Sequence, residues 1–207
     1  MNRLIAFLAA FLSSAAFAQA TPAIGTDAPD MLVKSVVDDV LAVIKDNKDP
    51  QMLRTLSEQK VVAHFDFRGM TQAAAGKNWR DASPSQQQSL ENGFRSLLVN
   101  TYTAALSRTT SGGKTVEVKP VPAAAVAQGE ALVKTVVKES GKPPVAIDYR
   151  MLKQGVSWKV VDVTIENISL VTNYRSTFSS EVARSGIDGL IKSLEEKSRA
   201  PTRGGMG

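Results

Sequence analysis

The sequence of 207 residues contains no cysteine and only one histidine, His64. Without cysteine, the chain cannot form a disulfide, a thiolate metal site or a cysteine nucleophile. One histidine leaves carboxylates as the remaining zinc ligands, so a zinc site is not expected. The sequence also lacks a phosphate-binding loop, a dinucleotide fingerprint and a G-x-S-x-G motif. These absences argue against most classes of enzyme.

Long apolar runs are equally scarce. The only one, Leu4 to Phe17, is too short to span a bilayer with polar flanks. It follows Arg3 and ends within Ala16-Phe17-Ala18, a small-x-small pattern, so residues 1–20 are predicted to be a secretory signal peptide. Cleavage is expected after Ala18 or Ala20. No cysteine follows for a lipid anchor. Residues 21–198 are predicted to form one domain, and residues 199–207 a disordered tail.

Charge of one sign is not concentrated anywhere. The formal net charge is +5, from 25 Lys and Arg against 20 Asp and Glu, and acids alternate with bases along the chain. Nucleic-acid binding usually needs a basic stripe with interleaved aromatic residues, and none is present. The charges are therefore read mainly as a solvated surface, with weak attraction to anionic headgroups as the second interpretation.

The elements that are present run in the order helices, strands, helices, which predicts an α+β domain. Apolar spacing and caps predict helices from Asp27 to Ile44, from Pro50 to Val62, from Asp66 to Gly76, and from Ser83 towards Gly112. Ser83-Pro84-Ser85-Gln86 is the clearest boundary, because Ser83 and Gln86 can form a capping box.

Alternating residues then predict an antiparallel meander with one apolar face. Its strands are expected at 115–119, 130–138, 145–151 and 156–166, with a β-bulge at Val160-Val161. Residues 120–128 are interpreted as a connection. Helical spacing returns at Ile168, and Gly186 is expected to interrupt it.

Two places in the sequence could supply catalytic groups. His64 and Asp66 could act together in acid–base chemistry, but a helix-end histidine beside a capping aspartate is the more common arrangement. Asp162 lies in a strand among apolar neighbours and could be a buried base. The commoner arrangement for such a residue is a carboxylate bonded to backbone or paired with an arginine.

Apolar residues dominate one face of the sheet and faces of several helices. The same faces could form a filled core, or could be held apart around a lipid. Periodicity alone does not distinguish these two arrangements.

Two long blocks of residues carry a resemblance that bears on this choice. The first includes Phe65-Asp66-Phe67, Trp79-Arg80 and Tyr102, and the second includes Trp158-Lys159-Val160 and Ser169-Leu170-Val171. In these blocks the sequence resembles the MlaC family, the periplasmic phospholipid-binding components of the toluene-tolerance (Mla) lipid transport system. The resemblance covers roughly residues 29–198. Asn167 departs from it, since glycine is expected there.

The resemblance implies an NTF2-like fold, with a curved four-stranded antiparallel sheet packed against several helices around an apolar cavity. It implies a periplasmic carrier that shuttles phospholipids between the outer and inner membranes and supports outer-membrane lipid asymmetry. It implies docking to an inner-membrane ABC lipid transporter complex and to an outer-membrane lipoprotein complex. A monomer without cofactor, with phospholipid as cargo and no enzymatic activity, is expected. The alternatives are an NTF2-like enzyme using Asp162 or His64, and an adaptor that binds protein.

Face and family together predict which residues line the cavity. From the sheet these are Val133, Thr135, Val137, Ile147, Tyr149, Met151, Trp158 and Val160. From the helices they are Met70, Phe94, Leu98, Tyr102, Val171, Tyr174 and Phe178.

Overall fold

The computed structural model describes residues 28–46, 49–107 and 114–199. The predicted signal peptide lies outside these residues, as does the predicted tail except for Arg199.

The amino-terminal part is helical, as predicted, but its second helix is shorter than expected. Helix α1 spans Pro29–Asp46 and α2 spans Pro50–Leu56. A π-helical turn (η1, Ser57–Val61) and a 3-10 turn (η2, Val62–His64) follow. These helical turns end at Phe65, which is extended and forms a single parallel bridge with Val160 of the sheet.

Of the next three helices, α3 and α5 begin at the caps that the sequence predicts, whereas the short α4 was not predicted. Helix α3 spans Phe67–Ala75, and the Asp66 carboxylate accepts the Gly69 N–H at 2.8 Å. Helix α4 (Lys77–Asp81) leads into α5 (Pro84–Ser107). The capping box is present: the Ser83 N–H donates to Gln86 Oε1 at 3.0 Å, and the Gln86 N–H donates to Ser83 Oγ at 3.2 Å.

The strands form one antiparallel sheet in the order β1-β2-β3-β4-β5. Their bounds are Thr115–Val118, Glu130–Lys138, Val145–Gln154, Ser157–Ile165 and Ile168–Ser169. The sheet thus has a short fifth strand beyond the four expected. The region predicted as a connection contains helix α6 (Ala123–Ala127).

The predicted β-bulge is confirmed by the strand register. Arg150 of β3 faces Asp162, but the next residue, Met151, faces Val160, so Val161 is the extra residue. Both Val160 and Val161 are buried as a result.

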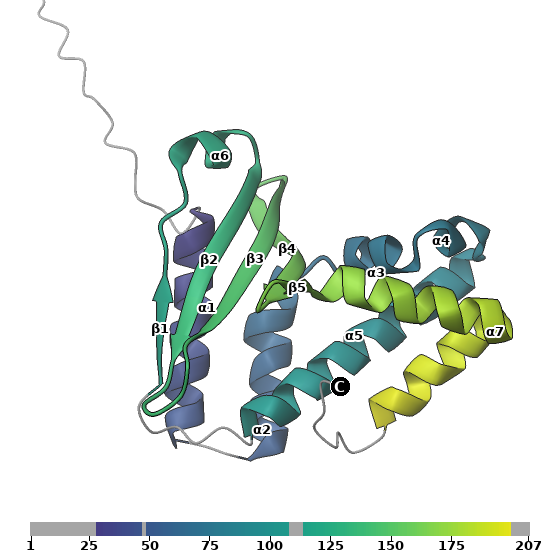
Figure 1. Ribbon diagram of the computed structural model, residues 1–207, viewed down its shortest axis with the longest axis horizontal. Helices are drawn as coiled ribbons and strands as arrows, with labels where there is room; N and C mark the ends of the chain where they lie inside the picture. Colours follow the sequence, from purple (N-terminus) through teal and green to yellow (C-terminus); the bar gives the residue numbers. More distant parts are fainter. Residues whose placement is uncertain (1–27, 47–48, 108–113, 200–207) are drawn as a thin grey trace, which may run out of the picture.

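The final helix, α7 (Leu170–Arg199), is broken where the sequence predicts. Gly186 has a φ of 71°, a left-handed value that glycine adopts without strain. Figure 1 shows that α7 leaves the sheet along α3 and then turns back towards α5.

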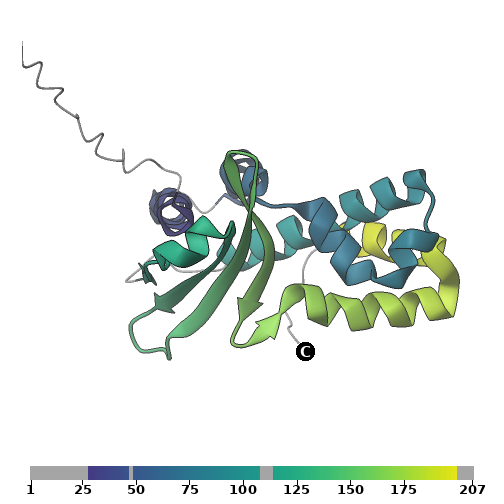
Figure 2. The ribbon, with the colours of Figure 1, turned by 90° about the horizontal axis from the view of Figure 1, so that it is seen from above.

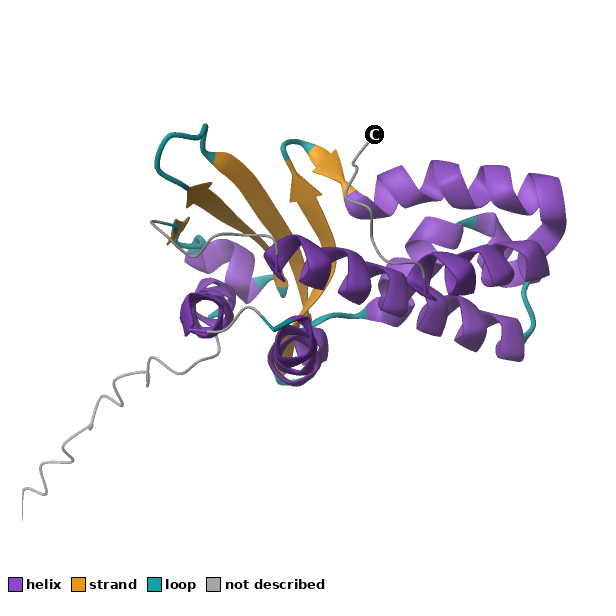
Figure 3. Ribbon diagram, turned by 90° about the horizontal axis from the view of Figure 1, so that it is seen from below, coloured by secondary structure: helices purple, strands orange, loops and turns teal. Residues whose placement is uncertain are grey.

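The sheet and the helices make up two halves of the molecule (Figures 1 and 2). Helices α1 and α2 cover one face of the sheet, whereas α3, α4, α5 and α7 pack on one another beside it (Figure 3). Each half has its own hydrophobic cluster.

Candidate lipid-binding site

The residues predicted from the helices lie together in the helical cluster. Met70, Phe94 and Phe178 are almost completely buried, and Leu98 and Val171 are buried as well. The half-buried Tyr102 and Tyr174 pack against the cluster. Phe94 makes edge-on contacts with two rings, with centroids 4.9 Å from Tyr174 and 5.1 Å from Phe178. Such contacts add to the stabilisation from burial.

Most residues predicted from the sheet lie in a second cluster. Val133, Met151, Trp158 and Val160 are buried there, and Ile147 and Tyr149 pack against them.

Two of the sheet residues predicted to line the cavity lie apart from that cluster. Thr135 is buried, and its hydroxyl donates to the Ile147 carbonyl at 2.7 Å. Val137 is half-buried and lies near the carboxyl end of β2.

The two clusters meet along a seam marked by Phe65 and Tyr102. Each of these side chains is half-buried and packs against both clusters. The two clusters that contain most of the predicted lining residues therefore adjoin at these two side chains. Phe65 belongs to the seam, although it was not among the predicted lining residues.

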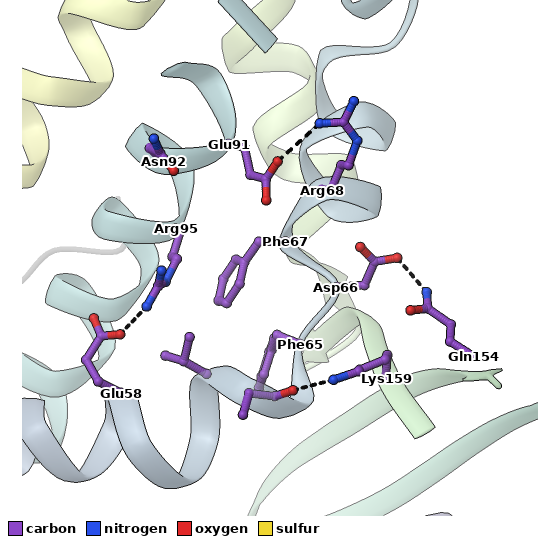
Figure 4. A pocket seen from close by; sticks show the side chains of 12 residues that line it. Glu58, Phe65, Asp66, Phe67, Arg68, Glu91, Asn92, Arg95, Gln154 and Lys159 are labelled. Carbon is purple, nitrogen blue, oxygen red and sulfur yellow. Dashed lines mark hydrogen bonds and ion pairs between the residues drawn. The ribbon is translucent and has the colours of Figure 1, made fainter. Parts of the chain in front are cut away.

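A pocket of about 430 Å³ lies beside the seam at Phe65. Residues of η1 and η2, the start of α3, one side of α5 and the β3–β4 hairpin line it (Figure 4). None of the predicted lining residues is among the residues bordering this pocket. The lining residues are Glu58, Val62, Ala63, Phe65, Asp66, Phe67, Arg68, Glu91, Asn92, Arg95, Gln154 and Lys159.

Ion pairs and hydrogen bonds ring the pocket. Arg95 pairs with Glu58, and Arg68 lies 3.5 Å from Glu91. Lys159 Nζ donates to the Ala63 carbonyl at 2.6 Å. In Figure 4 these groups surround the rings of Phe65 and Phe67, which are stacked with centroids 5.5 Å apart. The pocket thus combines an apolar base with a charged rim.

The family model described as "MlaC protein" matches residues 34–196. The chain belongs to the MlaC family.

Two members of known name or structure extend the match. A curated relative, the intermembrane phospholipid transport system binding protein MlaC of Haemophilus influenzae, is 20% identical over 90% of this chain and 89% of its own length. A solved structure, the phospholipid-binding protein from Ralstonia solanacearum in complex with a phospholipid, is 38% identical. It covers 82% of this chain and 96% of its own, with a TM-score of 0.73.

The departure from the expected MlaC pattern at Asn167 is local. Asn167 has a φ of 68°, and Glu166 before it has a φ of 48°, so both lie in the left-handed region. These residues form the turn between β4 and β5. Asparagine tolerates this conformation better than most residues, so it can take the place of glycine here.

The candidate catalytic carboxylate Asp162 is occupied by structural hydrogen bonds. Its Oδ1 accepts the N–H groups of Val163 at 2.8 Å and Val171 at 3.2 Å, and its Oδ2 accepts the Ser169 hydroxyl at 2.6 Å. It therefore ties β4 to the start of α7.

The other candidate pair, His64 and Asp66, is also engaged in the fold. The Asp66 carboxylate caps α3 and accepts the Gln154 amide at 2.7 Å. Burial, and then the positive charge of Lys159, lower the pKa of His64 below its usual value. The imidazole is thus biased towards its neutral form.

Within residues 28–46, 49–107 and 114–199, acidic residues and His64 form no group suited to a metal ion. The helices in the same ranges include none long and apolar enough to cross a membrane.

Sequence reasoning missed the charged rim because its members come from separate segments. One signal was available. Arg95 and Glu91 lie within the apolar stretch of α5 that holds Leu90, Phe94 and Leu98, and charges placed beside buried positions often have a specific partner.

Proposed function

We propose that this protein is a periplasmic carrier that encloses the acyl chains of a phospholipid between the sheet cluster and the helical cluster. The observation that carries the proposal is the phospholipid bound to the Ralstonia solanacearum relative, whose fold spans most of this chain. The two apolar clusters flanking the seam supply the hydrocarbon environment that such cargo needs.

The free energy of exposing the cargo explains why enclosure is needed. Two acyl chains carry roughly 30 methylenes, and each costs about 0.8 kcal/mol when moved into water, so full exposure costs roughly 24 kcal/mol. A dry cavity exchanges one hydrocarbon environment for another. The transfer from a bilayer then becomes nearly even.

The size of the cargo implies that the seam widens on loading. If a methylene takes about as much room as a water in liquid, roughly 30 Å³, two chains need on the order of 900 Å³. The pocket of about 430 Å³ beside Phe65 has about half of that volume, so it cannot hold the two chains, and the space between the clusters has to open. Phe65 and Tyr102, which contact both clusters, are the side chains that must give way.

In this proposal the protein is exported by residues 1–20 and moves phospholipid between the outer and inner membranes, which supports outer-membrane lipid asymmetry. Its docking partners are an inner-membrane ABC lipid transporter complex and an outer-membrane lipoprotein complex. It acts as a carrier and not as an enzyme. The bonding of Asp162 supports this, because a general base needs a carboxylate free to accept a proton.

The experiment is organic extraction of the purified protein followed by mass spectrometry. Near-stoichiometric phospholipid is expected. Ile147→Asp places a charge on the inner face of β3 and should abolish the co-purifying lipid. The matched control is Leu132→Asp, which makes the same kind of change at a side chain that is 47% exposed and faces Arg150 across the strands.

Wild-type extracts without phospholipid would refute the carrier function. Equal lipid loss in both variants would refute the assignment of the inner face.

A further inference from the structure

The pocket beside the seam has three cationic side chains brought together from three segments. Arg68 comes from α3, Arg95 from α5 and Lys159 from β4. Their charged ends surround the rings of Phe65 and Phe67 in Figure 4, and the apolar Val62 lines the same pocket. An apolar base with a cationic rim suits an amphiphilic anion.

Arg95 is incompletely satisfied in the described structure. Its Nη2 pairs with Glu58, but its Nε is buried and has no hydrogen-bond partner among the described residues. A buried N–H without an acceptor is costly, and a guanidinium can hold two oxygens of one anion side by side. Arg95 therefore has capacity for a further acceptor.

None of the carboxylates that line the pocket pairs with Lys159. Asp66 is engaged with Gly69 and Gln154, Glu58 pairs with Arg95, and Glu91 pairs with Arg68. Lys159 donates instead to a neutral acceptor, the Ala63 carbonyl. The positive charge of Lys159 also lowers the pKa of the neighbouring His64, although burial is the larger cause of that shift.

We propose that this pocket binds the phosphate group of the cargo, held by Arg95 and Lys159 with Arg68 at the rim, and that the phosphate displaces Glu58 from Arg95. The inference rests on the proposed carrier function, and it adds the residues that hold the head. The position fits, because Phe65 borders the pocket and contacts both clusters, so a headgroup here lies where the acyl chains enter the seam.

The chemistry predicts what is recognised and what is not. A phosphodiester is common to all glycerophospholipids, and guanidinium matches its paired oxygens. The alcohol beyond the phosphate would project past a rim open to solvent. Binding should therefore depend strongly on the phosphate and weakly on the head alcohol.

The test measures binding of short-chain soluble lipids to delipidated protein by calorimetry. The probes are dihexanoylphosphatidylglycerol, dihexanoylglycerol, which lacks the phosphate, and inorganic phosphate. Arg95→Gln and Lys159→Gln should each weaken binding of the phospholipid about tenfold, the effect of one charge-assisted hydrogen bond. Neither should alter binding of dihexanoylglycerol.

Competition by Glu58 gives the sharper result. Glu58→Gln should strengthen phospholipid binding several-fold, because it removes the acid that competes for Arg95. The gain should vanish in the Glu58→Gln/Arg95→Gln double variant. Lys134→Gln, at an exposed position of β2, is the matched control and should change nothing. Thermal melting of each variant verifies that it is folded.

The outcomes separate this inference from the carrier function. If extracted protein contains phospholipid but the Arg95 and Lys159 variants bind the probe as the wild type does, the phosphate site is wrong and the carrier function stands. If inorganic phosphate binds in an Arg95-dependent way and the phospholipid does not, the lipid assignment is overturned. If extracts hold no phospholipid, the carrier function fails with it.

Discussion

Phe94 allows a test of whether a buried residue belongs to an ordinary core or to a lipid-lined space. Its side chain is fully buried in the helical cluster and contacts the rings of Tyr174 and Phe178. In delipidated protein, Phe94→Ala should cost about 3–5 kcal/mol. For a domain of this size that is roughly 6–20 °C of melting temperature, at about 2–4 °C per kcal/mol.

The lipid-loaded protein should lose much less. If Phe94 lines the cargo space, an acyl chain can occupy the vacated volume, as hydrocarbons occupy engineered dry cavities. Three or four methylenes at about 0.8 kcal/mol each restore roughly 2–3 kcal/mol, so the loss should fall by about half. The loaded wild type should also melt above the delipidated wild type, because cargo binds only the folded chain.

Leu90 supplies the control. It is 1% exposed, lies on the same helix and belongs to the same cluster, but it is not a predicted lining residue. Leu90→Ala should cost about 2–5 kcal/mol in both forms. The assay is differential scanning calorimetry of loaded and delipidated protein. Equal losses for Phe94→Ala in the two forms would refute the reasoning and place Phe94 in a plain core.

Three further predictions concern other parts of the fold. Asp162→Asn should weaken three hydrogen bonds at the start of α7 and lower the free energy of unfolding by about 1–3 kcal/mol, while co-purifying phospholipid persists in mass spectra; loss of lipid in a folded variant would contradict it. Ser83→Ala removes one half of the capping box and should lower the urea midpoint by the equivalent of about 1 kcal/mol. Burial raises the pKa of Tyr149 to about 12, so the unfolded phenol ionises first. Tyr149 leaves stability unaffected below about pH 10, and between about pH 10 and 12 it should contribute a fall of about 1.4 kcal/mol per unit, measured as the difference between the wild type and Tyr149→Phe in urea unfolding across that window. Parallel profiles for the two proteins would show that the Tyr149 phenol is exposed to water.

Features set by short stretches of chain were predictable. The capping box needs only Ser83 and Gln86, and the strand at 130–138 has the predicted bounds because its alternation is unbroken. The bulge at Val161 was visible as two adjacent apolar residues in an alternating run. In each case the physical cause lies within a few residues, so a local sequence pattern is enough to predict the feature.

Features set by distant partners were not predictable. The end of the second helix depends on Phe65 pairing with Val160, almost a hundred residues away in the chain. Strand β5 forms because the Glu166–Asn167 turn brings Ile168 back beside Ile165. Apolar spacing alone placed Ile168 at the start of a helix.

The candidate site shows the same division. Periodicity assigned residues such as Val133 and Phe94 correctly to inward faces, and both are buried. It could not show that these faces form two clusters, or that Phe65 and Tyr102 join them. The charged rim of the pocket depends on four segments meeting in space, and no local pattern encodes that meeting.

The order of the elements also bears on how the chain acquires its structure. The helical cluster draws on α3 and α5, which precede the sheet, and on α7, which follows it. A polypeptide synthesised from its amino end can close the β2–β3 and β3–β4 hairpins early, because their partners are neighbours in sequence. Phe94 meets its ring partner Phe178 only once α7 is available, so the helical half is expected to be the last to become native, with its apolar surfaces exposed until then.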